Sequence, residues 1–184
     1  MVLKILPHHA DENEPRLADG YKWMGKPSDR TELLGLQQGG NSVWISPVTH
    51  ESSARVLFVG DAKVAHAWLF IRPRPLGPLQ GFEAYSLYTE PGERGKGYAP
   101  LLLEVALHTC GPLVSDREGM TAAAYRLWTK VRAPWQCSLV DLAGQRLPSG
   151  PTLTHFHSGH GATATRLLLE LVNLRPDAAD SPRA

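Results

Sequence analysis

Short runs of apolar and β-favouring residues, separated by glycine and proline, make up much of the first half of the chain. Valine, tryptophan and phenylalanine are frequent in these runs, as is typical of strands. The clearest runs are Ser42 to Val48, Arg55 to Val59, Val64 to Arg72 and Phe82 to Thr89. Gly60-Asp61 lies between the second run and the third and is typical of a tight hairpin turn. The pattern predicts consecutive antiparallel strands, preceded by a short strand over Val2 to Leu6.

After Gly97 the apolar spacing lengthens from two residues to three or four. Leucine, valine and alanine recur at this helical spacing between Leu101 and Cys110, and Gly111-Pro112 is expected to end the helix. The same criteria predict two more helices, over Thr121 to Arg132 and Ala162 to Leu174, and two short strands, over Leu113 to Ser115 and Trp135 to Leu142. This order predicts an α/β or α+β fold in which helices flank a mixed, mostly antiparallel central sheet.

The 184 residues suit one domain, since domains commonly hold roughly 100–200 residues. We expect this domain to span 1–176, with an irregular N-terminal segment over 1–30 and a flexible tail over 177–184. Thr31 to Gln38 favours neither a strand nor a helix. The 19 basic and 18 acidic side chains give a net charge of +1, which argues against a general electrostatic grip on nucleic acid or membrane. With two cysteines, no secretory signal and no apolar run of about 20 residues, the chain is expected to be cytoplasmic.

The most informative segment runs from Leu87 to Ala99, where a predicted strand ends in a glycine-rich turn and a helix begins. The first turn of a helix has unpaired backbone N–H groups and a partial positive charge. Gly95 and Gly97 carry no side chain, so an anionic group can approach those N–H groups closely. Arg94 and Lys96 add formal positive charge. The segment therefore predicts a phosphate-binding loop, and it lacks the glycine spacing of the Walker and dinucleotide-binding patterns.

This segment resembles motif A of the GNAT acetyltransferase superfamily, written R/Q-x-x-G-x-G/A, with Arg94, Gly97 and Ala99 at its fixed positions. The resemblance implies a GNAT-like fold with acetyl-CoA as co-substrate. In such proteins the loop amides bind the pyrophosphate, and the preceding strand splays from its neighbour and pairs with the pantetheine arm. By this resemblance Leu87 and Thr89 offer backbone groups to acetyl-CoA. The diphosphate is then held by Arg94, Gly95, Lys96, Gly97, Tyr98 and Ala99.

The second predicted helix resembles a later motif of the family, N-x-x-A-x-x-L-Y. Ala124 and Leu127 match, and Thr121 replaces the asparagine and can still cap the helix. Trp128 stands where the family commonly has a tyrosine that protonates the departing thiolate. An indole is no useful proton donor, so Trp128 is expected in the core or in the wall of the cofactor site. Tyr125, one turn earlier on the same face, is a candidate catalytic hydroxyl or a packing tyrosine.

By this resemblance the chain is a diverged member of the family, of the kind found in phages or mobile elements. It would transfer an acetyl group from acetyl-CoA to an amine by direct attack in a ternary complex. The amine must lose a proton, so a carboxylate or a histidine near the thioester serves as base. Glu83 on the predicted central strand and Asp116 after the next strand are the candidates, ahead of Ser115 and His66. The acceptor (a small molecule, a protein or a nucleobase) and the oligomeric state, a homodimer included, stay open.

Three histidines, His155, His157 and His160, lie close together in a predicted loop before the last helix. Zinc and iron accept such ligands, but no acidic or cysteine ligand lies beside them, so no metal site is predicted. Two other functions stay open. One is a catalytically inactive GNAT-fold module that binds or inhibits, which the missing tyrosine motivates. The other is a metal-dependent hydrolase built on the histidines.

Overall fold

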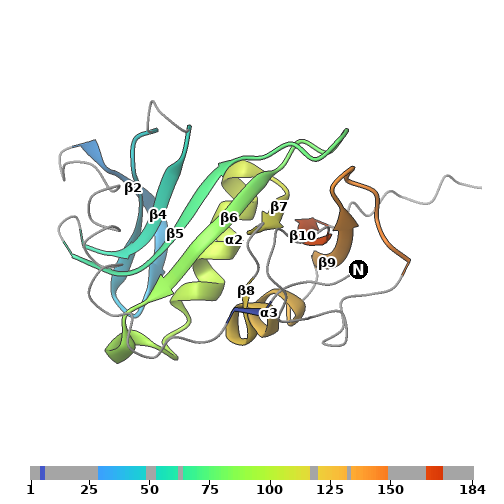
Figure 1. Ribbon diagram of the computed structural model, residues 1–184. Helices are drawn as coiled ribbons and strands as arrows, with labels where there is room; N and C mark the ends of the chain where they lie inside the picture. The colour runs from blue at the N-terminus through green and yellow to red at the C-terminus, as the bar shows by residue number, and fades with distance from the viewer. Residues whose placement is uncertain are drawn as a thin grey trace, which may run out of the picture.

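The chain folds around one large, mostly antiparallel sheet (Figure 1). The computed structural model describes residues 5–6, 29–48, 53–61, 64–116, 120–131, 134–148 and 165–171. The strands of the sheet are β2 (Thr31–Gln38), β3 (Asn41–Ile45), β4 (Arg55–Gly60), β5 (Ala65–Pro73), β6 (Phe82–Thr89), β7 (Leu113–Ser115), β9 (Trp135–Asp141) and β10 (Thr165–Leu171). Within the described residues they lie in the order β2-β3-β4-β5-β6-β7-β10-β9, and only β6 and β7 pair in parallel. A separate parallel pair joins β1 (Ile5–Leu6) to β8 (Met120–Thr121).

The strands predicted over Arg55 to Val59, Val64 to Arg72 and Phe82 to Thr89 are confirmed, and the first two form the predicted hairpin. The strand predicted over Ser42 to Val48 ends at Ile45, and of the strand predicted over Val2 to Leu6 the structure describes only Ile5–Leu6. Between β4 and β5, the amide of Asp61 donates to the carbonyl of Val64 at 3.1 Å, and Asp61 Oδ1 accepts from the amide of Val64 at 2.7 Å. The ambiguous stretch over Thr31 to Gln38 is strand β2. It pairs with β3 through Gly39-Gly40, whose φ angles of 57° and 80° suit the mirror-image turns that join antiparallel strands.

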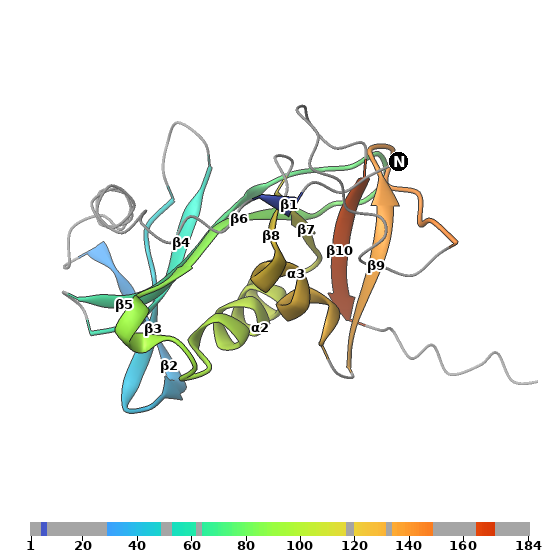
Figure 2. The same ribbon diagram turned by 60° about the horizontal axis from the view of Figure 1, so that its bottom comes forward.

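Both helices of the described chain, α2 (Tyr98–Cys110) and α3 (Ala122–Thr129), lie on one side of the sheet (Figure 2). Their apolar side chains share one core cluster with alternate residues of β5, among them Leu69 and Ile71. The predicted first helix is confirmed. The second is confirmed with its cap, since Thr121 Oγ1 accepts from the amide of Ala124 at 3.1 Å, although it ends at Thr129 rather than Arg132.

The helix predicted over Ala162 to Leu174 is wrong, because residues Thr165–Leu171 form strand β10 between β7 and β9. Three consecutive leucines explain the error. Leu167 and Leu169 are 0% exposed and face α2 and α3, whereas Leu168 is 1% exposed and packs on the opposite face with Val114. A continuous apolar run fits a strand buried on both faces as well as a helix, and sequence spacing cannot separate the two. The pairing partners on either side decide for the strand.

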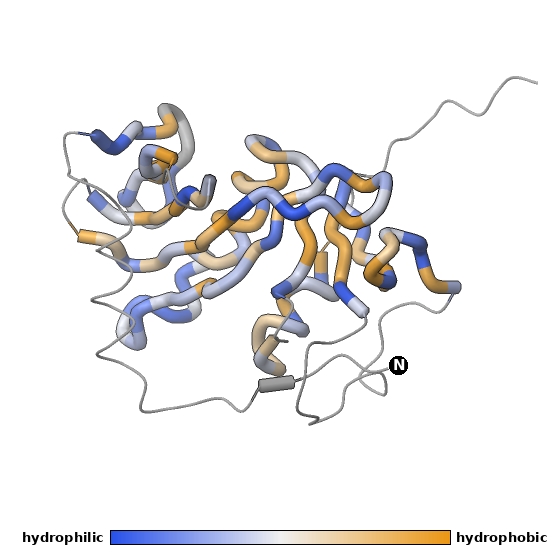
Figure 3. Tube along the Cα trace, turned by 45° about the horizontal axis from the view of Figure 1, so that its top comes forward, coloured by the Kyte–Doolittle hydropathy of each residue, from blue (hydrophilic) through white to orange (hydrophobic). Residues whose placement is uncertain are grey.

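Hydrophobic residues, orange in Figure 3, lie mainly along the strands and helices in the middle of the described structure. The face of the sheet opposite α2 has its own cluster, which is rich in aromatic residues: Trp44, Val56, Phe58, Ala65, Trp68, Phe70, Tyr85 and Tyr88. None of the described helices is long and apolar enough to cross a membrane. The predicted tail over 177–184 and most of the segment predicted over 1–30 lie outside the described residues.

Candidate functional site

The turn between β6 and α2 presents backbone donors that none of the described residues accepts from. Gly95 and Gly97 have φ angles of 82° and 83°, in the left-handed region that glycine adopts without strain. Within the described chain, the amides of Gly95, Lys96 and Gly97 donate to no other residue. The helical ladder begins only where the amide of Leu101 donates to the carbonyl of Gly97 at 3.3 Å. These amides therefore lie at the positive end of α2 without a partner in the described part of the chain, as an anion site requires.

The turn is also open. A side-chain carbon placed on Gly92 or Gly95 would have no heavy atom within 4 Å beyond its chain neighbours. The cationic side chains beside it, Arg94 and Lys96, are exposed. Arg94 Nε donates to the carbonyl of Thr89 at 3.3 Å, which holds the guanidinium next to the loop. An approaching anion would thus meet free amides and two cations.

One of these cations already has a partner in the protein. Lys96 Nζ lies 2.8 Å from Glu93 Oε2, and both groups are partly exposed. The hydrogen bond to Lys96 lowers the pKa of Glu93, and the same bond raises the pKa of Lys96. An exposed pair of this kind contributes little to stability and exchanges readily for another anion.

Strand β6 runs on past the end of its neighbour β7, and we call the place where β7 ends the fork. The two strands pair only from Phe82↔Leu113 to Ala84↔Ser115, whereas β6 continues to Thr89. Beyond the fork β6 has an extra residue relative to β5, because Trp68 pairs with Tyr88 but Phe70 pairs with Tyr85. This bulge contains Ser86 at φ 53°, an uncommon conformation for a residue other than glycine. A bulge bends its strand and increases the local twist, so β6 changes direction just beyond the end of β7.

The free edge of β6 beyond the fork includes Thr89. The amide of Glu90 donates to the carbonyl of His66 on β5 at 2.9 Å. Backbone groups of successive extended residues point to opposite edges of a strand, so those of Thr89 face the open edge. The bond from Arg94 Nε to the carbonyl of Thr89 agrees with this direction. Leu87 is half-buried on the α2 side of the same stretch.

Charged and phenolic side chains gather on the other face of the fork, opposite α2. Glu83 is 0% exposed, and its Oε2 accepts from Arg72 Nε at 2.7 Å. The guanidinium of Arg72 also lies over the ring of Tyr85, 4.5 Å from its centroid. Tyr85 and Asp116 are the residues that directly follow the last β6–β7 pair, Ala84↔Ser115, so both stand where the strands part.

Tyr85 was missed in the sequence, although strand alternation from Glu83 would have placed both on one face. Burial is the main cause that raises the pKa of Tyr85; Arg72 lowers it in part, and Glu83 and Asp116 raise it further. The phenol is therefore protonated at neutral pH and can donate a proton or a hydrogen bond at the fork.

The two aromatic residues predicted on α3 lie elsewhere, in the core. Tyr125 is 5% exposed and Trp128 is 3% exposed, and both belong to the cluster on the α2 side of the sheet. Burial, with a smaller contribution from Cys137, raises the pKa of Tyr125. The structure thus separates them from Glu83 and Asp116, which lie on the opposite side.

Ser115 and His66, the weaker candidates for the base, contact other residues of the fold. Ser115 Oγ accepts from the amide of Leu167 at 3.0 Å and so joins β7 to β10. His66 stacks on Tyr98, with ring centroids 6.3 Å apart, next to the loop. The side chain of Tyr98 is buried, while that of Ala99 is half-buried. His155, His157 and His160 lie outside the described residues.

Comparison with known proteins gives no family assignment: no protein-family model matches the chain, and no curated protein matches it significantly.

Proposed function

We propose that the protein is an acetyl-CoA-dependent N-acetyltransferase with a GNAT-like fold, found in solution. One observation carries this proposal: within the described residues, the edge of β6 beyond Ala84 has no strand partner on the β7 side, and it leads through the short turn over Pro91–Glu93 to loop amides that no described residue uses. An extended thiol-bearing arm can pair with a strand edge, and a diphosphate can bind helix N-terminal amides. Acetyl-CoA contains these two parts in that order. The resemblance of Arg94, Gly97 and Ala99 to motif A of the GNAT superfamily points to the same ligand.

The fork would place the thioester between the two strands, next to Tyr85 and Asp116. The acceptor amine attacks the carbonyl carbon, a C–N bond forms, the C–S bond breaks, and the amine gives up a proton. Asp116 is the better placed base of the two carboxylates, because it is half-buried and within reach of a bound substrate, whereas Glu83 is fully buried. The departing thiolate takes a proton, for which the phenol of Tyr85 is the donor on this face. Tyr125 as proton donor stays a prediction.

A first experiment tests the cofactor. Isothermal calorimetry with acetyl-CoA, CoA and ATP should show binding of the two CoA compounds and much weaker binding of ATP, which lacks the pantetheine arm. Native mass spectrometry of the purified protein should show retained CoA. Equal affinity for ATP and CoA would contradict the pairing of an arm with β6, and no binding of any of the three would refute the cofactor assignment.

A second experiment tests the chemistry. Release of free CoA thiol is followed with a panel of small amines, peptides and nucleosides. Asp116→Asn should lower the rate of acetyl transfer about 100-fold while it leaves CoA affinity unchanged. Glu104→Gln is the matched control, because Glu104 is an exposed carboxylate on α2. Equal rates in the wild type and Asp116→Asn would remove Asp116 as base.

A catalytically inactive GNAT-fold module is the second candidate, and the burial of Tyr125 and Trp128 in the core favours it. It predicts tight acetyl-CoA binding without thiol release across the whole acceptor panel. The same two experiments therefore separate an enzyme from a binding module.

A further inference from the structure

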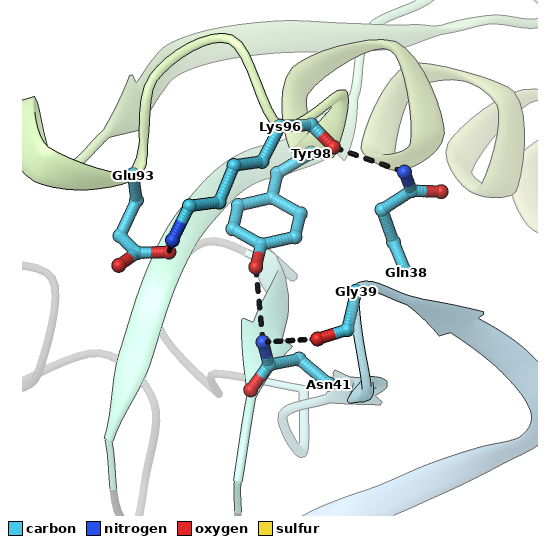
Figure 4. A network of polar contacts seen from close by, with 6 residues as sticks. All are labelled: Gln38, Gly39, Asn41, Glu93, Lys96 and Tyr98. Atoms are coloured by element: carbon cyan, nitrogen blue, oxygen red, sulfur yellow. Dashed lines mark hydrogen bonds and ion pairs between the residues drawn. The ribbon is translucent and has the colours of Figure 1, made fainter.

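The tip of the β2–β3 hairpin lies against the loop that begins α2, as Figure 4 shows. Gln38 Nε2 donates to the carbonyl of Lys96 at 2.9 Å. Asn41 Nδ2 donates to the hydroxyl of Tyr98, also at 2.9 Å. The two contacts lie on either side of Gly97, the residue that precedes the first turn of α2.

The contact from Gln38 sets the direction of one loop amide. The carbonyl of Lys96 and the N–H of Gly97 belong to the same planar trans peptide, in which they point in opposite directions. Since the carbonyl points to Gln38, the N–H of Gly97 points away from the hairpin. A side-chain carbon on Gly97 would lie 3.3 Å from Gln38 Nε2, so the absence of a side chain there allows the close approach.

The contact from Asn41 fixes the first residue of the helix. Tyr98 is 2% exposed, and its ring also stacks on His66. Asn41 Nδ2 additionally lies 3.4 Å from the carbonyl of Gly39, so the amide bridges the turn of the hairpin and the hydroxyl of Tyr98. The hairpin therefore contacts the residue on each side of Gly97: the backbone carbonyl of Lys96 and the side-chain hydroxyl of Tyr98.

We propose that Gln38 and Asn41 are positioning residues that hold the loop amides in the orientation that binds the diphosphate of CoA. This inference rests on the proposed function. Glycines at positions 95 and 97 give the loop its shape but also a large conformational freedom, which binding would have to restrict. Contacts that hold the loop before the ligand arrives reduce this entropic cost and so strengthen binding.

The test compares Gln38→Met, which keeps the length of the side chain and removes the donor, with Gln37→Met on the same strand. Gln37 pairs with Ser42 across the hairpin and is exposed, so it is a matched control. Affinities are measured for CoA, for inorganic pyrophosphate and for pantetheine, which has no diphosphate. Gln38→Met should weaken CoA and pyrophosphate about three- to tenfold and leave pantetheine unchanged, as the loss of one hydrogen bond predicts. The amide resonance of Gly97 should shift in the free variant and not in the control.

Each other outcome contradicts the inference. Equal affinities of Gln38→Met and wild type for CoA would show that the hairpin does not position the loop. A parallel loss for CoA and pantetheine would show a general structural effect. If Gln38→Met lowers the melting temperature, Tyr98→Phe, which removes only the hydroxyl that Asn41 binds, should weaken CoA and pyrophosphate and leave pantetheine unchanged; affinities equal to those of the wild type would contradict the inference. Failure of the wild type to bind CoA or pyrophosphate would refute the proposed function and this inference with it, whereas wild-type binding that both variants keep unchanged would refute only the inference.

Discussion

Arg72 and Glu83 are paired across β5 and β6, and the guanidinium of Arg72 binds a single carboxylate oxygen of Glu83 through two nitrogens. Arg72 Nε and its terminal Nη2 lie 2.7 and 2.6 Å from Glu83 Oε2. The two partners differ in burial, since the side chain of Arg72 is 30% exposed and that of Glu83 is 1% exposed. A buried charge that loses its partner is far more costly than an exposed one, because it cannot regain hydration.

This difference predicts that removing Arg72 destabilises the protein more than removing the charge of Glu83. Arg72→Met leaves the carboxyl of Glu83 buried at the fork without the guanidinium and should lower the free energy of unfolding by about 3 kcal/mol. Glu83→Gln leaves a guanidinium that can reach water and should cost about 1–2 kcal/mol. Chemical denaturation of both variants at pH 7 measures the order. The reverse order would mean that the pair is not held as the structure shows.

Cys137 on β9 predicts a loss of stability at alkaline pH. Burial raises the pKa of its thiol to about 12, from an ordinary value of 9.0. Between these values the unfolded chain ionises the thiol while the folded protein keeps it neutral, so the unfolded state gains stability as pH rises. The free energy of unfolding should therefore fall from about pH 9 upwards more steeply in the wild type than in Cys137→Val. Burial also raises the pKa of Cys110, but a hydrogen bond with Thr109 and the charge of Arg55 lower it in part, so Cys110→Val should flatten the profile less. Equal pH profiles for the wild type and Cys137→Val would contradict the prediction.

Ser86 predicts an unusual response to mutation inside a strand. Glycine adopts a φ of 53° without strain, whereas this angle is strained for a β-branched residue. Ser86→Gly should change the free energy of unfolding by less than about 0.5 kcal/mol, although glycine usually weakens strands, whereas Ser86→Val should cost about 1–2 kcal/mol. Thermal unfolding of the two variants checks this order. If valine were tolerated better than glycine, Ser86 would be in extended conformation and the bulge would be absent.

Glu93 competes with any anion at the loop for Lys96, so its removal predicts a gain of affinity. Glu93→Gln should tighten the binding of CoA about threefold at low salt, and the gain should shrink as ionic strength rises. Calorimetry at two salt concentrations measures both effects. Glu104→Gln removes the same charge from a more distant turn of α2 and should change affinity less. A similar gain in both variants would indicate long-range charge rather than release of Lys96.

Features that depend on neighbouring residues were predictable from the sequence. Local residue spacing and backbone preference predicted four such features: strand β6, helix α2, the cap of α3 by Thr121 and the glycine turn between Arg94 and Gly97. These properties act over a few residues, and the sequence alone contains them.

Other features were decided only by the tertiary structure, because they depend on which segments become neighbours. The leucines of β10 suit a helix until β7 and β9 flank them. The sequence does not show that Glu83 has a cationic partner; the register of β5 and β6 places Arg72 opposite it. Tyr85 lies near Asp116 only because β6 and β7 pair up to Ala84↔Ser115. Gln38 donates to the carbonyl of Lys96 only because the β2–β3 hairpin lies against the start of α2. Spacing along a chain carries no information about such long-range pairings, and the burial and partners that they create determine the chemistry of each side chain.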